Sequence, residues 1–324
     1  MPAHVVKATS RRANRPPHAM MAATVTTSTP ASATPDSRPG RGDASPQEWT
    51  IEPRAAGPAA RGREVWAYRR LLGFFARRAL EKLHRNTMLG RTWLLIRPLF
   101  PLLVKTLIFG SVLGLGSDGV PYFLFLVVGT AGWDLFASGL MWATRSLELN
   151  RGFLARVYVP RVILPVAMLT PGLFAFVIHV GVIAAGIAFY YLRDGHWYLA
   201  SPEKLPWALL ALVLMLALAL AIGFFTAVLA TAGRDVRFTL AYVLDFWAIL
   251  TPILYPLSTF PAEWRWVVLL NPMAAFIETF KYGLLGIGTF DGRILGTAAA
   301  ITVATFIGGL WFFGRAEASA VDRI

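Results

Sequence analysis

Six apolar stretches follow one another along most of this chain, separated by short polar segments. A helix needs about 20 apolar residues to cross the ~30 Å hydrocarbon core of a bilayer, and each stretch is near that length or longer. Helices also satisfy their own backbone hydrogen bonds, which lipid cannot do. We therefore predict an all-α integral membrane protein with six transmembrane helices, at residues 97–116, 120–142, 162–190, 206–232, 238–257 and 294–314.

The segment between the fifth and sixth stretches has a different pattern. Residues 258–292 contain two shorter apolar pieces, at 263–270 and 272–285, which are separated by Asn271 and Pro272. Pieces of 8 and 14 residues are too short to span a bilayer. We predict that they form re-entrant helices, which enter the membrane and leave it on the same side.

A basic amphipathic segment at residues 61–90 precedes the first stretch. Apolar residues recur there at helical spacing and share one face, which comprises Tyr68, Leu71, Leu72, Phe75, Ala79 and Leu83. Arginines occupy most of the opposite face, at Arg69, Arg70, Arg77, Arg78 and Arg85. This pattern is typical of a helix that lies along lipid headgroups, although a soluble surface helix has a similar stripe.

Residues 1–60 lack apolar periodicity and are rich in Ala, Pro, Ser, Thr, Gly and Arg. Such a segment cannot bury enough apolar surface to offset the entropy lost on ordering. We predict a disordered N-terminal tail over 1–60 and one transmembrane domain over 61–324.

Composition and charge agree with a lipid environment. The chain is 56% hydrophobic and 15% charged, whereas soluble domains are roughly 25% charged. The net charge of +13 would suit nucleic acid or a membrane. If the N-terminus is cytoplasmic, 25 of the 31 Lys and Arg residues fall on the cytoplasmic side and five on the other. The positive-inside rule then predicts cytoplasmic termini, and we expect contact with membrane lipid and no nucleic-acid partner.

Motifs for catalysis or cofactor binding are absent from the sequence. It has no cysteine, which excludes thiolate chemistry, and no G-x-x-x-x-G-K-[ST] motif for ATP phosphates. The G-x-G-x-x-G pattern at 114–119 follows a membrane helix, so we interpret it as a turn. A membrane-embedded transferase would need convergent polar groups, such as a His-Asp pair, which the sequence does not reveal. We expect no catalytic residue, metal site or cofactor in this chain.

Three ionisable residues, Lys105, Asp134 and Asp245, lie inside predicted spans. Each would cost at least ~2.5 kcal/mol at the bilayer centre if it faced lipid. We therefore expect them to face protein or water, and favour structural pairing or a role in lining a path over a proton relay. His179 has no partner at metal-ligand spacing, and we interpret it as a packing residue.

Aromatic residues are dense in the second and fifth stretches. An interfacial belt accounts for many of them, but sugar rings also stack on aromatic faces through their C–H surfaces. We predict that aromatic side chains line a substrate path, at Trp133, Phe136, Trp142, Trp247 and Tyr255.

Several local motifs occur in a recognisable order around these helices. They are the basic helix before the first span, LNRGFLARVYVPRVILP at 149–165, Arg234-Asp235, TPILYP at 251–256, and Asn271-Pro272 followed by Glu278. From residue 65 to about 320, the chain resembles the permease subunits of ABC type 2 transporters that export O-antigen, teichoic acid or capsule polysaccharide.

The resemblance implies roles for the cytoplasmic segments. Residues 146–161 correspond to the coupling helix that docks on an ATPase, with contacts expected at Arg151, Phe153, Arg156, Val157 and Pro160. A second, smaller contact is expected at Arg234 and Asp235. Residues 61–90 correspond to a gate helix whose five arginines are candidates to meet the pyrophosphate of a lipid-linked glycan.

On the opposite side of the membrane, the resemblance implies that residues 258–292 shape the outer mouth, and Glu278 joins the candidate substrate path. Lys281 stands where many members of the family have Arg, so the charge is kept.

The resemblance also implies partners and a location. We expect a second copy of this chain and two ABC ATPase subunits, which bind the ATP and Mg, in the bacterial cytoplasmic (inner) membrane. The expected substrate is a lipid-linked polysaccharide. The alternative within the same family is a small amphipathic drug or lipid, and the dense aromatics and the basic helix favour the polymer.

Overall fold

In the computed structural model, the described residues are 66, 68–84, 93–154, 156, 159–261, 263, 268 and 270–322. Within these ranges the regular structure is entirely helical, without strands, which confirms the predicted all-α class. The N-terminal tail, Arg85, Val157 and most of 263–270 lie outside the described residues.

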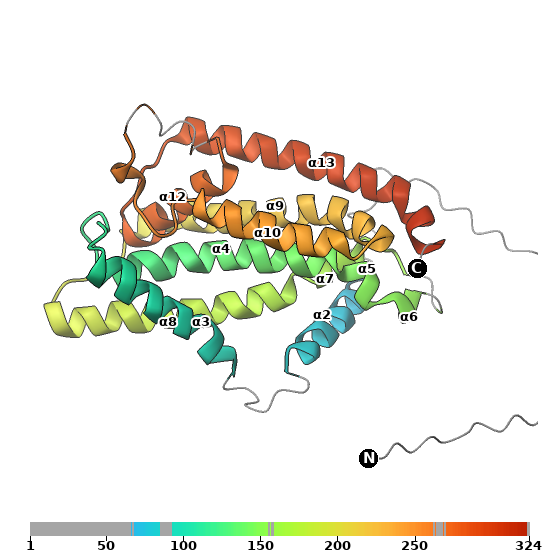
Figure 1. Cartoon of the computed structure of the whole chain (residues 1–324), viewed down its shortest axis with the longest axis horizontal. Coiled ribbons are helices and arrows are strands. Elements are labelled where there is room, and N and C mark those ends of the chain that lie inside the picture. The colour runs from blue at the N-terminus through green and yellow to red at the C-terminus, as the bar shows by residue number, and fades with distance from the viewer. Residues whose placement is uncertain are drawn as a thin grey trace, which may run out of the picture. The chain divides into compact units, whose positions relative to one another are not determined.

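Within the described part of the chain, four helices are long and apolar enough to cross a membrane, and Figure 1 shows how they are arranged. They are α4 (Tyr122–Thr144), α7 with α8 (Ile163–Ala167 and Thr170–Asp194), η3 with α9 (Pro202–Lys204 and Leu205–Ala232) and α13 (Gly292–Asp322). These helices correspond to the second, third, fourth and sixth predicted spans. The ends follow local chemistry: α8 stops where Gly195 takes a left-handed conformation with φ of 69°.

The first and fifth predicted spans correspond to shorter helices. In the first, α3 (Trp93–Lys105) continues as the π-helix η2 (Thr106–Val112), and its apolar part is Pro98–Val112. In the fifth, α10 (Asp235–Ile249) has 15 residues and is followed by a turn and η4 (Leu257–Thr259). The proline-rich turn interrupts the helix within the apolar stretch, because proline lacks the backbone N–H that donates the helical hydrogen bond.

Helix α4 lies at the centre of the bundle and packs against α8 and α9, while α12 (Pro272–Leu285) packs against α4, α9 and α13. Glycine allows some of these close approaches. A Cβ added at Gly172 of α8 would lie 3.2 Å from the Gly139 amide nitrogen of α4, and one at Gly223 of α9 would lie 2.7 Å from the Ala143 Cβ. Small residues thus bring the helix backbones together, as is common in membrane bundles.

A second apolar cluster forms where α2 (Arg69–His84) packs on α7. Phe75 and Ala79 of α2 are fully buried there, as expected for its apolar face. That face contacts protein along part of its length, and Arg69, Arg70 and Arg77 remain exposed on the other side. The amphipathic helix is therefore attached to the bundle through its apolar face.

Candidate functional site

Two short helices form the candidate coupling segment, α5 (Ser146–Leu149) and α6 (Arg151–Leu154). Asn150 separates them; it is buried, and its side-chain amide donates a 2.8 Å hydrogen bond to the Ser146 carbonyl. This bond stabilises the break between the helices. Figure 1 shows α5 and α6 at the end of the bundle opposite α12.

The candidate coupling residues face different surroundings. Arg151 and Arg156 are exposed, Phe153 is half-buried and Pro160 is buried. Arg234 and Asp235 are exposed at the start of α10. The four charged residues are therefore accessible to a partner.

The Phe153 ring points into the protein, toward α2. Its centroid lies 5.2 Å from that of Phe75, edge to face, and 5.9 Å from that of Phe74. Nearby, the Lys82 ammonium donates a 3.1 Å hydrogen bond to the Leu149 carbonyl. The coupling segment is thus attached to α2 by aromatic packing and by a hydrogen bond, which the sequence did not reveal.

Charges connect the same end of the bundle to α10. Arg237 forms a 2.9 Å ion pair with Glu148 of α5, which joins the two candidate coupling surfaces. Burial, followed by the neighbouring Arg78 and Arg145 cations, lowers the pKa of Lys82. Five cations, Arg77, Arg78, Lys82, Arg145 and Arg237, lie in this region with the carboxylates of Glu81 and Glu148, and this excess of positive charge suits an anionic group.

A surface hollow of about 560 Å³ lies along α2 and is lined by Phe74, Arg77, Arg78, Glu81 and Lys82. Arg77 and Glu81 form an exposed 3.4 Å ion pair one turn apart. Two of the five predicted gate arginines thus border one hollow.

Three of the predicted path aromatics come together. The Trp133, Phe136 and Trp247 rings have centroid separations of 5.2 to 6.2 Å and join α4 to α10. Phe136 and Trp133 are both buried and Trp247 is half-buried, so in this conformation the first two rings support the third. Outside this cluster, Tyr255 packs on Phe260, and Trp142 lies near the end of α4.

Asn271 connects this aromatic cluster to α12. Its side-chain oxygen accepts a 2.8 Å hydrogen bond from the Trp247 indole N–H and a 3.0 Å hydrogen bond from the Met273 amide. The second bond caps α12. Its side-chain amide donates 2.9 Å to the Thr251 hydroxyl. The Asn271-Pro272 motif therefore begins a helix and holds the end of α10.

Glu278, predicted in the substrate path, is buried in α12 with Lys281. The Lys281 Nζ and Glu278 Oε1 atoms are 3.6 Å apart, and the side chains are 0% and 2% exposed. In this conformation Glu278 therefore contacts protein groups.

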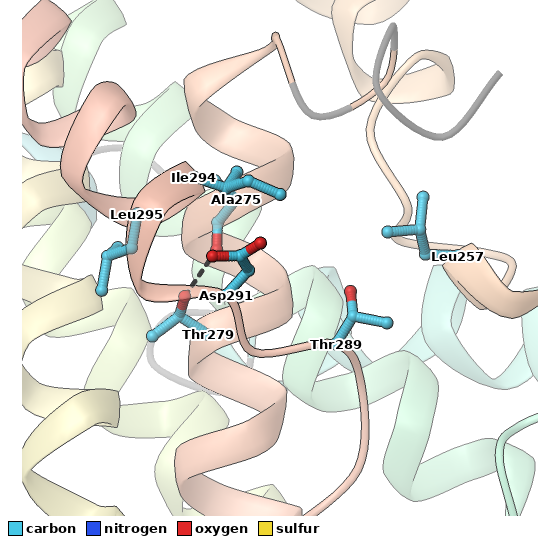
Figure 2. A pocket seen from close by; sticks show the side chains of 7 residues that line it. All are labelled: Leu257, Ala275, Thr279, Thr289, Asp291, Ile294 and Leu295. Carbon is cyan, nitrogen blue, oxygen red and sulfur yellow. Dashed lines mark hydrogen bonds between the residues drawn. The ribbon is translucent and has the colours of Figure 1, made fainter. Parts of the chain in front are cut away.

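A cavity of about 160 Å³ lies beside this region, between α12 and the start of α13. Figure 2 shows Thr279 and Ala275 of α12 on one wall, Ile294 and Leu295 of α13 on another, and Leu257 from the preceding connection. Thr289 and Asp291 add polar groups.

The structure also forms a His-Asp pair that the sequence did not indicate. The Asp134 carboxylate of α4 lies 3.4 Å from Nε2 of His179 in α8, and His179 Nδ1 lies 3.0 Å from the Ala175 carbonyl oxygen. Asp134 thus contacts a protein group on one side, while 43% of its side chain is exposed. Asp245 is exposed and Lys105 half-exposed. Among the residues that the structure describes, no group of three or more His, Cys, Asp or Glu side chains is placed to hold a metal.

Known proteins resemble this chain over most of its length. Residues 70–285 match the family described as ABC-2 type transporter. An O-antigen export system permease protein RfbA from Myxococcus xanthus is 27% identical over 222 residues, which cover 68% of this chain and 82% of that protein. Two proteins of the same name from Klebsiella pneumoniae are each 25% identical; the matches cover 66% and 69% of this chain, and 82% and 87% of theirs.

Proposed function

This chain belongs to the ABC-2 type transporter family, and from that premise we propose that it is the permease subunit of an ATP-driven exporter of a lipid-linked polysaccharide. The chain is a transport subunit and not an enzyme. The observation that carries the proposal is the family match over residues 70–285, together with relatives named as O-antigen export permeases that align over more than four fifths of their length.

The ATPase is a separate subunit in this proposal, because the sequence lacks a phosphate-binding loop. It binds ATP and Mg and docks on the exposed Arg151, Arg156, Arg234 and Asp235. Docking would also press on α6, whose Phe153 contacts α2. ATP-driven movement would thereby reach the candidate gate helix through direct contact.

A second copy of the chain completes the transport path. The support comes from α10, which exposes a charged carboxylate among aromatic and aliphatic side chains: Phe238, Tyr242, Asp245, Phe246 and Ile249. A charge at membrane depth is costly against lipid, so this face suits protein or a water-filled path. Within each copy, α10 and the short α3–η2 helix add two spans to the four long helices, which gives a six-span subunit.

The proposed direction of transport is outward across the bacterial inner membrane, with both termini cytoplasmic. The α2 arginines attract the anionic pyrophosphate at the cytoplasmic entrance. Trp247, which is half-buried, then provides a flat apolar surface along which sugar rings slide, with the buried Trp133 ring packed behind it. Residues 258–292 border the outer mouth.

The test is purification of the tagged full chain from native membranes in mild detergent, with mass spectrometry and an ATPase assay. We expect a subunit with a nucleotide-binding motif to co-purify, and lipid-linked glycan to change its ATPase rate. Recovery of the chain without an ATPase, under conditions that retain other membrane complexes, would contradict the proposal.

A further inference from the structure

Two ionisable side chains of α12, Glu278 and Lys281, are almost completely enclosed by protein, with 2% and 0% exposure. Removing charges from water costs several kcal/mol per ion unless pairing and hydrogen bonds compensate. The contacts of each side chain therefore indicate what the pair holds in place.

Lys281 reaches the connection between α10 and α12. Its Nζ donates a 2.6 Å hydrogen bond to the Pro252 carbonyl and lies 3.6 Å from the centroid of the Phe125 ring of α4. Gly129 of α4 leaves room for it, because a Cβ there would lie 3.3 Å from the Lys281 Cε and 3.2 Å from the Ile253 carbonyl oxygen. The lysine is thus enclosed between α4 and this connection.

Glu278 reaches the connection on the other side of α12. Its Oε2 accepts hydrogen bonds from the Thr289 amide, at 3.1 Å, and from the Thr289 hydroxyl, at 3.4 Å. Gly288 allows this approach, because its φ is 89° and a Cβ there would lie 3.1 Å from the Glu278 Oε2. The carboxylate therefore holds the turn that leads to α13.

We propose that Lys281 and Glu278 are positioning residues for export, which lock the connections before and after α12 onto that helix so that the three segments move as one unit. The ion pair between them joins the two attachments. This inference rests on the proposed function, in which 258–292 borders the outer mouth. An apolar pair would leave the Pro252 carbonyl and the Thr289 amide without these partners.

Other contacts determine which part of the path this unit controls. The Tyr122 hydroxyl of α4 donates a 2.6 Å hydrogen bond to the Leu254 carbonyl, which belongs to the connection that Lys281 holds. Asn271, at the start of α12, binds Thr251 and the Trp247 indole. In the proposal, movement of α12 therefore reaches Trp247 through Asn271, and the Tyr122 bond is the contact with α4 that such movement would break.

The absence of native cysteine allows a specific test, because a single introduced thiol is the only one in this chain, whose labelling is measured on its own gel band, apart from the ATPase subunits. Leu257 is 1% exposed, belongs to the connection held by Lys281 and lines the cavity in Figure 2. In the complete permease–ATPase complex in nanodiscs, we would measure the rate at which a membrane-impermeant maleimide labels Leu257→Cys.

We expect Lys281→Met to raise this labelling rate about tenfold or more, because loss of a buried pair frees the connection. Lys281→Arg, which keeps the charge and the donors, is expected to label and export close to the parent. Glu278→Gln gives a second test, because it keeps an acceptor for Thr289 but removes the carboxylate charge, and it is expected to raise labelling too. It decides the matter if Lys281→Met does not fold.

The control is Leu164→Cys, a fully buried position in the cluster around α2 and α7. Its labelling should stay unchanged in the Lys281 and Glu278 variants. Parent-like labelling of Leu257→Cys in Lys281→Met and Glu278→Gln, or an equal rise at Leu164→Cys, would overturn the inference. Failure of the parent complex to export glycan would refute the proposed function. The labelling comparison does not depend on that result, so the two failures can be told apart.

Discussion

Single residues that meet across helices hold much of the bundle together, and His179 illustrates how. It lies in α8, with Nδ1 near the Ala175 carbonyl and Nε2 near Asp134 of α4. The imidazole is 3% exposed, whereas the Asp134 side chain is 43% exposed. Loss of the aspartate should therefore lower stability more than its own partial burial suggests, because it leaves the buried His179 Nε2 without its nearest partner.

We predict that Asp134→Leu lowers the free energy of unfolding by about 1–3 kcal/mol, the usual cost of an unsatisfied buried polar group. His179→Phe added to Asp134→Leu should recover part of this loss, because it removes the orphaned nitrogen. Thermal unfolding of the purified chain in detergent would measure both changes. Strictly additive losses would show that the two side chains do not interact.

The resemblance places Phe153 at the contact with the ATPase, whereas in the structure its ring packs on Phe75 of α2. We predict that Phe153→Ala reduces export severalfold while the chain still inserts and the ATPase still turns over, because the ring packs α6 on Phe75 of α2. Removal of a buried phenylalanine costs about 3–5 kcal/mol, and less for a half-buried one. Export and ATPase rates in the same vesicles would separate coupling from folding.

The matched control is Phe189→Ala, which removes an exposed ring near the C-terminal end of α8. It should leave export unchanged. Equal export by the Phe153 variant and the parent would show that the contact with α2 carries no movement.

At the scale of elements, helix α2 combines two functions on opposite faces. Phe75 and Ala79 attach it to the bundle, while Arg69, Arg70 and Arg77 are exposed and Arg78 is half-buried. The apolar residues and the Lys82–Leu149 hydrogen bond attach the helix without using the exposed arginines, so the arginines can be altered without detaching it.

We predict that simultaneous change of Arg69, Arg70, Arg77 and Arg78 to Gln weakens recognition of an anionic headgroup and lowers export at low substrate. Raising the ionic strength should weaken export by the parent more than export by this variant, because salt screens exposed charges. The fourfold Arg→Lys variant keeps the charge and is the control. Parent-like export by the Gln variant would limit the arginines to holding the helix at the membrane.

The crossing of α4 and α8 depends on small residues. We predict that Gly172→Leu lowers the free energy of unfolding by about 1–3 kcal/mol, because its side chain would meet the Gly139 backbone. Gly181→Leu, in the same helix, is the control because no heavy atom lies within 4 Å of its added Cβ. Detergent unfolding curves would compare them, and equal effects would contradict the close-packing argument.

For the whole molecule, the exposed faces of the helices differ in chemistry. Helix α8 exposes apolar side chains such as Val177 and Val180, which suits lipid, whereas α10 exposes Tyr242 and Asp245. This difference distinguishes a lipid-facing side from one that suits a second copy or a path.

We predict that Tyr242→Cys forms a disulfide-linked dimer on mild oxidation in native membranes, because its exposed face is where the second copy is proposed. Val180→Cys, equally free of competing native thiols, should not. Non-reducing gels would show the dimer. Cross-linking at Val180→Cys alone would place the contact between copies on another face.

The sequence by itself determined the membrane class, the all-α fold, four of the six predicted spans, the amphipathic face of α2 and the motifs that carry the family resemblance. These are local properties, because apolar length and helical periodicity are readable within one segment. They also located the residues from which the candidate coupling surface and the aromatic cluster are built.

Only the tertiary structure decided which side chains meet: Asp134 with His179, Phe153 with Phe75, Arg237 with Glu148, and Lys281 with Pro252. Each of these pairs joins different segments of the chain. A membrane helix such as α9 is apolar on all sides, so its pattern does not determine how it is rotated about its own axis. Packing sets that rotation, and with it the direction in which each polar side chain points.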